Sequence, residues 1–241
     1  MPLAGLPIEF DGLRIAHLSD FHLGVPSRGA LAAEGAVAWV ASRKPDLVCI
    51  TGDLLSRPRG EPLLRRLLGQ LGPAYAVLGN HDRADSRDPF SRRVELGDLG
   101  ATELLSDESR VVELRGQRVQ IVGVDPASYS LGIARPERHL DPTAALRILL
   151  CHFPGVARTL EPGAYDLVLA GHVHGGQIVL PYPGGRFLFA HPLAGEDRGI
   201  YRHLGTTLHV SPGVGTTFVP LRFFARPEVT ELVLRREPHV D

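Results

Sequence analysis

The chain has 241 residues, of which 44% are hydrophobic and 22% charged, an ordinary composition for a soluble globular protein. Its formal net charge is −1, so composition gives no argument for a general polyanion binder. No uninterrupted apolar run reaches the ~18 residues of a transmembrane helix, and residues 1–10 lack the basic and apolar regions of a signal peptide. The sequence therefore predicts a cytoplasmic protein with no transmembrane segment, and it leaves peripheral membrane contact open.

The first part of the chain alternates strand-like and helix-like segments. Apolar runs at 14–19, 47–51 and 74–78 predict buried strands. Residues 29–43 carry apolar side chains among alanines, and residues 62–71 carry leucines at helical spacing, so both segments predict helices. Repeated β–α units of this kind indicate a parallel sheet with right-handed crossovers.

The rest of the chain predicts further strands separated by turns. Residues 110–114 and 118–124 predict a hairpin around Arg115-Gly116-Gln117. Short apolar runs predict strands at 147–151, 165–170, 177–180, 207–210 and 229–234. Residues 181–203 are the longest poorly patterned stretch and predict a loop bordering the site described next. Because no repeat or linker interrupts the pattern, we expect one domain over residues 1–241. Cys49 and Cys151 lie in apolar runs and are expected to be buried and unpaired.

Five polar clusters follow these apolar runs. They are Asp20-Phe21-His22, Gly52-Asp53, Gly79-Asn80-His81-Asp82, His152 and Gly171-His172-Val173-His174. In an α/β sheet, ligands bind beyond the carboxyl ends of the strands, so the clusters predict one shared site. Carboxylate, imidazole and amide groups are ligands that suit zinc, iron and manganese. The clusters therefore predict a metal site.

Spacing within two clusters suggests shared ligation. Residues i and i+2 of an extended strand point to the same side. Asp20 and His22 are therefore expected to reach one cation together, and so are His172 and His174 if their segment is extended.

With the remaining candidates, the number of ligands exceeds what one metal ion needs. The carboxylate of Asp53 can bridge two cations, Asn80 offers a carbonyl oxygen, and His152 adds an imidazole. Seven candidate ligands exceed the set that one tetrahedral zinc uses. Two metals about 3.5–4 Å apart that share Asp53 account for them better.

Each cluster also has an ordinary structural explanation when it is taken alone. Asp20 could cap a helix, Gly52-Asp53 could be a plain turn, and His152 could be a structural histidine. Two histidines bracketed by glycines at 171–175 suit a metal better than a core. The recurrence of all five clusters at the same structural position favours the metal site over these alternatives.

In this order, the motifs Asp-x-His, Gly-Asp, Gly-Asn-His-Asp, a lone His and Gly-His-x-His resemble those of the calcineurin-like metallophosphoesterases, over about residues 15–177. The resemblance implies an α/β fold of two mixed β-sheets packed as a sandwich flanked by helices. It implies a metal-dependent phosphoester hydrolase, for which we favour phosphodiesters. Gly175-Gly176-Gln177, residues 213–216 and Arg222-Phe223 are also similar to a bacterial phosphodiesterase branch that includes UDP-2,3-diacylglucosamine hydrolase-like enzymes.

The resemblance also implies a role for each candidate residue. One divalent metal, Mn, Fe or Zn, would be held by Asp20, His22, Asp53 and His174, and the second by Asp53, Asn80, His152 and His172. His81 would contact the phosphate and protonate the leaving oxygen, and Asp82 would orient it. Two cations would lower the pKa of a bridging water to give a hydroxide that attacks phosphorus in line. An imidazolium can protonate the departing alkoxide.

Other basic side chains receive smaller roles. Arg83 follows the third cluster and could reach a phosphate oxygen. Arg28 and Arg222 are weaker candidates for substrate contact. The histidines outside the clusters are expected to be structural: His17, His139, His191, His203, His209 and His239.

The sequence leaves the substrate and the oligomeric state open. We expect a small phosphodiester, or a lipid or nucleotide-sugar ester. The alternatives are a phosphomonoesterase, a nuclease, or a catalytically silent metal-binding scaffold. The lack of a basic stripe argues against a nuclease. The presence of all seven candidate ligands and of His81 argues against a silent scaffold.

Overall fold

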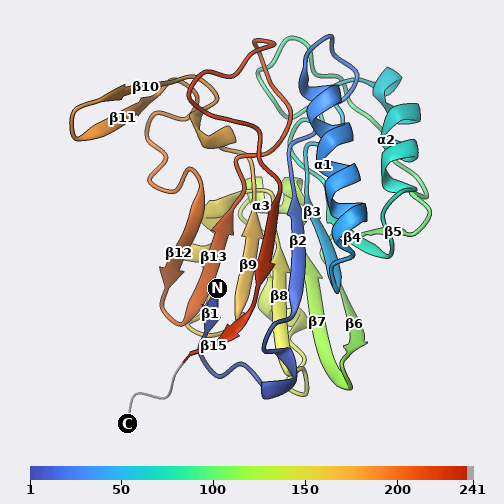
Figure 1. Ribbon diagram of the computed structural model, residues 1–241, viewed down its shortest axis with the longest axis vertical. Helices are drawn as coiled ribbons and strands as arrows, with labels where there is room; N and C mark the ends of the chain where they lie inside the picture. Colours follow the sequence, from blue (N-terminus) through green and yellow to red (C-terminus); the bar gives the residue numbers. More distant parts are fainter. Residues whose placement is uncertain (238–241) are drawn as a thin grey trace.

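Two mixed β-sheets pack face to face in the computed structural model, which describes residues 1–237 (Figure 1). The first sheet has the order β14 (Thr230–Val233), β2 (Arg14–Leu18), β3 (Leu47–Thr51), β4 (Ala74–Val77) and β5 (Thr102–Leu104). The second has the order β12 (Gly199–His203), β13 (Thr206–Val210), β9 (Leu167–Ala170), β8 (Leu146–Leu150), β7 (Gln117–Gly123) and β6 (Glu108–Leu114). The central pairs of both sheets are parallel, whereas β14, β12 and β6 pair antiparallel with their neighbours.

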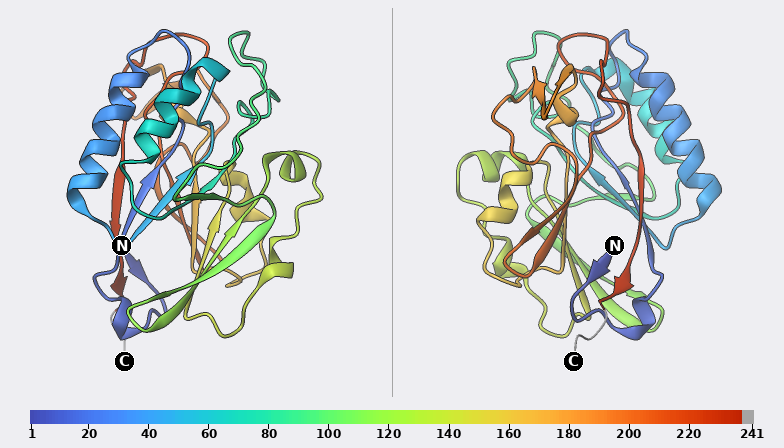
Figure 2. Two further views of the ribbon diagram at one scale, coloured as in Figure 1. Left: turned by 90° about the vertical axis from the view of Figure 1, so that its right-hand side faces the viewer. Right: turned by 60° about the vertical axis from the view of Figure 1, so that its left-hand side comes forward.

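Helices cover the outer faces of this sandwich. The helices α1 (Gly29–Arg43) and α2 (Glu61–Leu68) lie side by side on the first sheet, and the short α3 (Pro126–Ser130) lies on the side of the second sheet (Figure 2). Single 3-10 turns occur at Ile8–Phe10, Pro58–Gly60, Pro136–His139, Pro154–Arg158 and His174–Gly176. Two small strand pairs complete the described chain, β1 (Pro2–Leu3) with β15 (Arg235–Arg236) and β10 (Val179–Tyr182) with β11 (Gly185–Leu188).

The helices form where the leucine and alanine spacing predicts them. Helix α1 buries Ala33, Val37 and Val40 on one face, and it ends at Lys44, whose φ of 49° is left-handed, just before Pro45. Helix α2 buries Leu64, Leu67 and Leu68 and stops there, three residues before the predicted end. Both buried faces follow the i, i+3, i+4 spacing of an amphipathic helix.

Three apolar clusters hold the layers together. One lies between the two helices and the first sheet, one lies between the sheets, and one lies on the outer face of the second sheet. Strands β2 and β3 therefore contribute side chains to two clusters at once: Leu18 and Ile50 face the helices, whereas Ile15 and Cys49 face the other sheet. Strands buried on both faces explain why their sequences are continuous apolar runs.

The predicted loop over residues 181–203 is wrong in part. It contains strand β11, which forms a hairpin with β10, and strand β12, which pairs with β13. Both strands are short and their residues are largely exposed, so their sequences lack the apolar run that marks a buried strand. Strand β5 and helix α3 were likewise too short to leave a clear pattern.

The described residues confirm a simpler expectation. Cys49 and Cys151 are both buried and unpaired. Within residues 1–237, no helix combines the length and the apolar character needed to cross a membrane. His239 lies outside the described residues.

Two histidines connect the sheets inside the core. The Nδ1 atoms of His17 on β2 and His209 on β13 lie 2.8 Å apart, and His17 Nε2 lies 2.8 Å from Thr51 Oγ1. Because the Thr51 hydroxyl donates to Ser19, it accepts from His17 Nε2–H, which leaves His17 Nδ1 to accept from His209. Burial lowers the pKa of His17 well below its usual value and lowers that of His209 to about 4. The pair is therefore neutral at pH 7.

Acidification is expected to destabilise the fold through this pair. The pKa of His209 falls from 6.5, its ordinary value, to about 4 on folding, so below pH 6.5 the unfolded chain binds more protons. The stability present above pH 6.5 is lost as the pH falls through 4, with about 2 kcal/mol lost by pH 5. Urea unfolding with EDTA at pH 7.5 and pH 5 measures this loss. His209→Gln keeps a donor for His17 without titrating, and should lose about 2 kcal/mol less than wild type. An equal loss in both proteins contradicts the prediction.

Candidate metal centre

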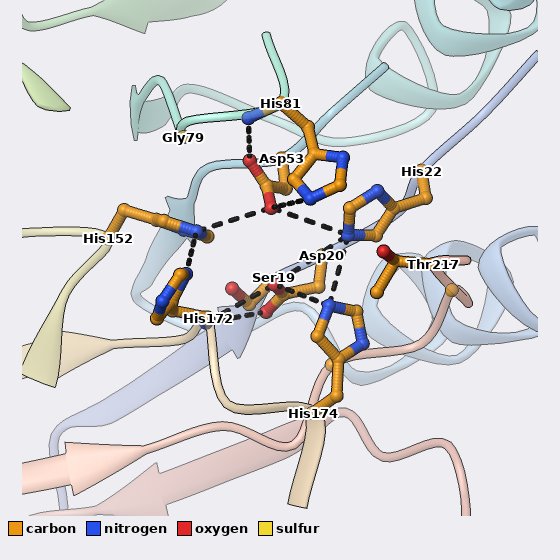
Figure 3. Close-up of polar contacts among 12 residues, drawn as sticks. Ser19, Asp20, His22, Asp53, Gly79, His81, His152, His172, His174 and Thr217 are labelled. Carbon is orange, nitrogen blue, oxygen red and sulfur yellow. Dashed lines mark hydrogen bonds and ion pairs between the residues drawn. The ribbon is translucent and has the colours of Figure 1, made fainter. Parts of the chain in front are cut away.

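The five polar clusters meet at one end of the sandwich. Each lies just beyond the carboxyl end of a strand: the first three follow β2, β3 and β4 of one sheet, and the last two follow β8 and β9 of the other. Because the parallel strands of both sheets end on the same side, their loops converge there, and Figure 3 shows the side chains pointing toward one another. The structure thus brings all seven predicted ligands together.

Four of these residues form a first group. Asp20, His22, Asp53 and His174 are buried, and each offers a ligand atom within 4.8 Å of the others. His22 Nε2 lies 3.0 Å from His174 Nε2 and 3.4 Å from Asp53 Oδ2, while His174 Nε2 lies 3.3 Å from Asp20 Oδ1. Such a set of two imidazoles and two carboxylates matches a divalent metal site.

A second group adjoins the first at Asp53. His152 Nε2 lies 3.2 Å from Asp53 Oδ2, and His172 Nδ1 lies 3.1 Å from both His152 Nε2 and Asn80 Oδ1 (Figure 3). The same oxygen of Asp53 therefore faces a histidine of each group. The neighbouring residues His172 and His174 are divided between the groups, so they do not reach one cation together as the i, i+2 spacing suggested.

The backbone explains this division. The segments are not extended: Asp20, His22, Asp53, His172 and His174 all have φ between 48° and 75°. Residues other than glycine rarely adopt this left-handed region, and such strain concentrates at functional sites. The left-handed turns, rather than strand alternation, aim these side chains into the site.

Two glycines are required for the close approach of the clusters. A Cβ at Gly79 would lie 2.0 Å from Asp53 Oδ1, and a Cβ at Gly171 would lie 2.5 Å from Asp20 Oδ2. Both positions therefore exclude any larger residue unless a candidate ligand moves. This requirement explains why the third and fifth motifs have glycine at these positions.

Hydrogen bonds behind the rings orient them toward the centre. His152 Nδ1 lies 2.8 Å from the Thr51 carbonyl oxygen, which can only accept, so Nδ1 carries a proton and Nε2 is the ring atom that points to the centre. His22 Nδ1 lies 3.1 Å from Ser56 Oγ on the side away from the centre. This arrangement of outer partners is the one that orients histidines as metal ligands.

The charge states also fit a metal site. Burial lowers the pKa of His22 to about 3 and lowers those of His172 and His174 well below the usual value, so these rings are neutral at pH 7. Burial opposes the charge on Asp53 and His152, but their mutual attraction outweighs it. It holds the pKa of Asp53 well below its usual value and raises that of His152 to about 9. A cation bound here would replace the proton on His152 as the positive charge that pairs with Asp53.

His81 lies at the edge of both groups. Its Nε2 is 4.0 Å from Asp53 Oδ2 and 3.0 Å from Ser86 Oγ, and its backbone N–H donates to Asp53 Oδ1. The Nδ1 atom lies 2.5 Å from Ser91 Oγ and 3.8 Å from Asp88 Oδ2. Ser86, Ser91 and Asp88 had no sequence signal, because they come from an irregular loop.

Asp82 differs from its predicted role. Its carboxylate accepts hydrogen bonds from the backbone N–H groups of Leu54, Leu55 and Gly79, and so joins the second and third clusters. Burial, together with the nearby Asp53 carboxylate, raises the pKa of Asp82 to about 7. The orienting contacts of the His81 ring are instead those with Ser91 and Asp88. Asp82 shapes the turn that carries His81 and does not hold its ring.

Two of the three arginine candidates, Arg83 and Arg222, contact other residues of the chain. Arg83 Nη2 lies 2.5 Å from Asp125 Oδ2, whose carboxylate also caps α3. Arg222 donates to the carbonyl oxygens of Gly215 and Pro212, and its Nη2 lies 3.1 Å from His174 Nδ1. Arg222 therefore supports a candidate ligand, while Arg28 is exposed at the start of α1.

His191 was expected to be structural, but it lies beside the centre. Its ring centroid is 4.6 Å from that of His172. Two cavities of about 430 and 340 Å³ meet at His191, and the larger one also reaches His172. Only the fold of the 181–203 segment decides this position, because no pattern around His191 indicates it.

Comparison with known proteins identifies the family of this chain. The model of the calcineurin-like phosphoesterase family matches residues 13–176, more than half of the chain. The chain belongs to the calcineurin-like phosphoesterase family. The predicted family is therefore confirmed, and so is the predicted fold of two mixed sheets flanked by helices. The finer resemblance to UDP-2,3-diacylglucosamine hydrolase-like enzymes stays a prediction.

Individual proteins of other organisms also align over most of the chain. The uncharacterized metallophosphoesterase YkoQ of Bacillus subtilis strain 168 is 31% identical over 238 residues, which cover 94% of this chain and 84% of YkoQ. The phosphodiesterase YaeI of Escherichia coli K12 is 28% identical over 229 residues, covering 92% of this chain and 82% of YaeI. Among solved structures, the NAD nucleotidase of Haemophilus influenzae aligns with a TM-score of 0.47 and 13% identity, covering 85% of this chain and 46% of that protein.

Proposed function

We propose that this calcineurin-like phosphoesterase is a hydrolase that uses two divalent metal ions, Mn, Fe or Zn, and prefers phosphodiesters. The observation that carries the proposal is the position of Asp53 Oδ2. This oxygen lies 3.4 Å from His22 Nε2 of the first group and 3.2 Å from His152 Nε2 of the second. A carboxylate shared by two ligand groups is the arrangement that a two-metal site requires.

Each part of the site has a task in this proposal. Asp20, His22, Asp53 and His174 would hold one cation, and Asp53, Asn80, His152 and His172 the other. When bound, the cations supply an activated water and neutralise phosphate charge. His81 donates a proton to the leaving oxygen through Nε2, the ring atom that faces the centre. Ser91 and Asp88 hold the opposite side of its ring.

The preference for phosphodiesters rests on the relative YaeI, which is described as a phosphodiesterase. A small phosphodiester, or a lipid or nucleotide-sugar ester, would enter beside His191, where the two cavities meet. Arg83 is kept as a candidate phosphate contact that would have to share its guanidinium with Asp125. We further propose a cytoplasmic location and one catalytic domain spanning residues 1–241.

Hydrolysis of bis-p-nitrophenyl phosphate by protein stripped with EDTA and reloaded with manganese tests the proposal. We expect activity only after reloading, two metal ions per chain by elemental analysis, and a higher kcat/KM than on p-nitrophenyl phosphate. Protein that holds two metals but hydrolyses neither ester would overturn the enzyme in favour of a silent scaffold. A higher kcat/KM on the monoester would favour the phosphomonoesterase alternative.

A further inference from the structure

The hairpin of β10 and β11 is apolar on both of its faces. Cross-strand partners and alternate residues share a face, so the pairing of Leu180 with Phe187 and of Tyr182 with Gly185 places these three large side chains together. They are 48%, 50% and 57% exposed. On the other face, Val179 and Leu188 are buried in a cluster with Ala225. An antiparallel pair with one packed face normally carries polar residues on the other, so the exposed apolar face calls for an explanation.

This exposed face continues into two neighbouring segments. The Phe189 ring lies 5.1 Å from that of Phe187, and Phe189 lines one cavity with Phe218 and Val219. Phe223 is joined to the base of β10, because Val179 N–H donates to its carbonyl oxygen. We name this surface the apolar crest and define it by its exposed side chains, Leu180, Tyr182, Phe187, Phe189, Phe218, Val219, Leu221, Phe223 and Phe224. A concentration of this kind marks an interaction surface.

Basic residues outnumber acidic ones around the crest, although the exposed acid Glu228 lies two positions after Arg226. Arg186, Arg198 and Arg226 lie in or beside its segments, and Arg198 and Arg226 are exposed. The acidic residues nearest to it in the 181–203 segment, Glu196 and Asp197, are buried and paired: Glu196 with Arg158 and His203, and Asp197 with Arg186. The exposed Arg198 and Arg226 outnumber the exposed Glu228, so the net charge that this surface presents is positive, which complements an anionic partner.

The shape of the crest favours a fluid partner over a rigid one. Figure 1 shows the hairpin standing away from the sandwich at the upper left. A projecting element with aromatic side chains and flanking arginines suits the boundary between lipid headgroups and acyl chains, where the rings enter and the guanidinium groups stay at the phosphate level. We propose that the apolar crest docks this protein on the surface of an anionic lipid bilayer.

Docking through the crest would also bring the candidate metal centre close to the bilayer surface. The crest residue Phe189 is two positions before His191, whose ring lies 4.6 Å from that of His172. The crest and the metal centre therefore lie at the same end of the molecule. This surface goes beyond the proposed hydrolysis, because binding to a bilayer can be measured without any turnover.

Cosedimentation with vesicles tests the proposal. We expect the metal-loaded wild-type protein to bind vesicles of phosphatidylglycerol and phosphatidylcholine more strongly than vesicles of phosphatidylcholine alone, and to bind less in high salt. Leu180→Ser/Phe187→Ser should weaken binding about tenfold, because two large apolar side chains are lost from the docked face. Tyr182→Ser at the hairpin tip should weaken it in the same direction without changing the Leu180–Phe187 pair.

The matched control removes exposed apolar residues elsewhere. Leu131→Ser/Ile133→Ser follows α3, changes side chains that are also largely exposed, and should bind vesicles as wild type does. Circular dichroism and hydrolysis of soluble bis-p-nitrophenyl phosphate should be the same in all four proteins. Wild type that ignores anionic vesicles, or binds neutral ones equally well, overturns the proposal. The proposal is also overturned if the wild-type protein is a dimer that does not bind vesicles and the hairpin variants are monomers. The crest would then bind a second copy of this chain.

Discussion

Asp53→Asn is expected to lower the kcat of phosphodiester hydrolysis about 1000-fold, which corresponds to about 4 kcal/mol of transition-state stabilisation. Asp53 Oδ2 lies between histidines of both ligand groups, and Oδ1 accepts the backbone N–H of His81. Asparagine keeps the size of the side chain but removes the negative charge that two cations would share. Because metal ions contribute several kcal/mol to such reactions, losing their common ligand should remove most of the rate. Steady-state kinetics and elemental analysis on the same samples measure both effects.

The control for this variant makes the same Asp→Asn change at a residue outside the candidate metal centre. Asp85→Asn alters an exposed acid of the loop that follows the third cluster, and should leave kcat and metal content unchanged. We expect Asp53→Asn to retain at most one metal ion per chain. If it retained two metals and wild-type activity, Asp53 could not be the shared ligand and the two-metal proposal would fail.

His81→Ala is expected to slow hydrolysis about 100-fold when the leaving group is a poor one such as phenolate. General acid catalysis matters most when the departing oxygen is basic, so the loss should be smaller for p-nitrophenolate, which leaves without a proton. His81 fits this role because its Nε2 faces Asp53 while Ser91 and Asp88 hold its other side. Kinetics on a series of aryl methyl phosphates, plotted against the leaving-group pKa, measures the effect, and the slope should steepen in the variant.

Metal content separates this role from a structural one. His81→Ala should keep both metal ions, because no group of candidate ligands includes His81. His139→Ala, in the 3-10 turn Pro136–His139, serves as the matched histidine control and should behave as wild type. A loss of equal size across all leaving groups would show that His81 acts on the phosphate and not on the leaving oxygen.

The sequence predicted best where one local rule determines the structure. Continuous apolar runs located the central strands, because a strand buried on both faces needs no alternation. The polar residue after each run marked its end, and parallel strands bring such ends together. Asp20, Asp53 and His152 could therefore be assigned to one site without any coordinates. The hairpin and β12 were missed because short exposed strands depend on partners that the local sequence does not reveal.

The motifs by themselves determined the family of this protein and the residues that meet at its centre, since residue type and order along the chain suffice for both. Only the tertiary structure decided how those residues divide. Left-handed backbone turns direct His172 and His174 to different groups, and close approach at Gly79 places Asp53 between them. The tertiary structure also decided the role of Asp82, whose carboxylate accepts hydrogen bonds from backbone N–H groups. The His81 ring contacts Ser91 and Asp88 instead. Contacts between segments far apart in the chain depend on the packing of the two sheets, and no local pattern encodes that geometry.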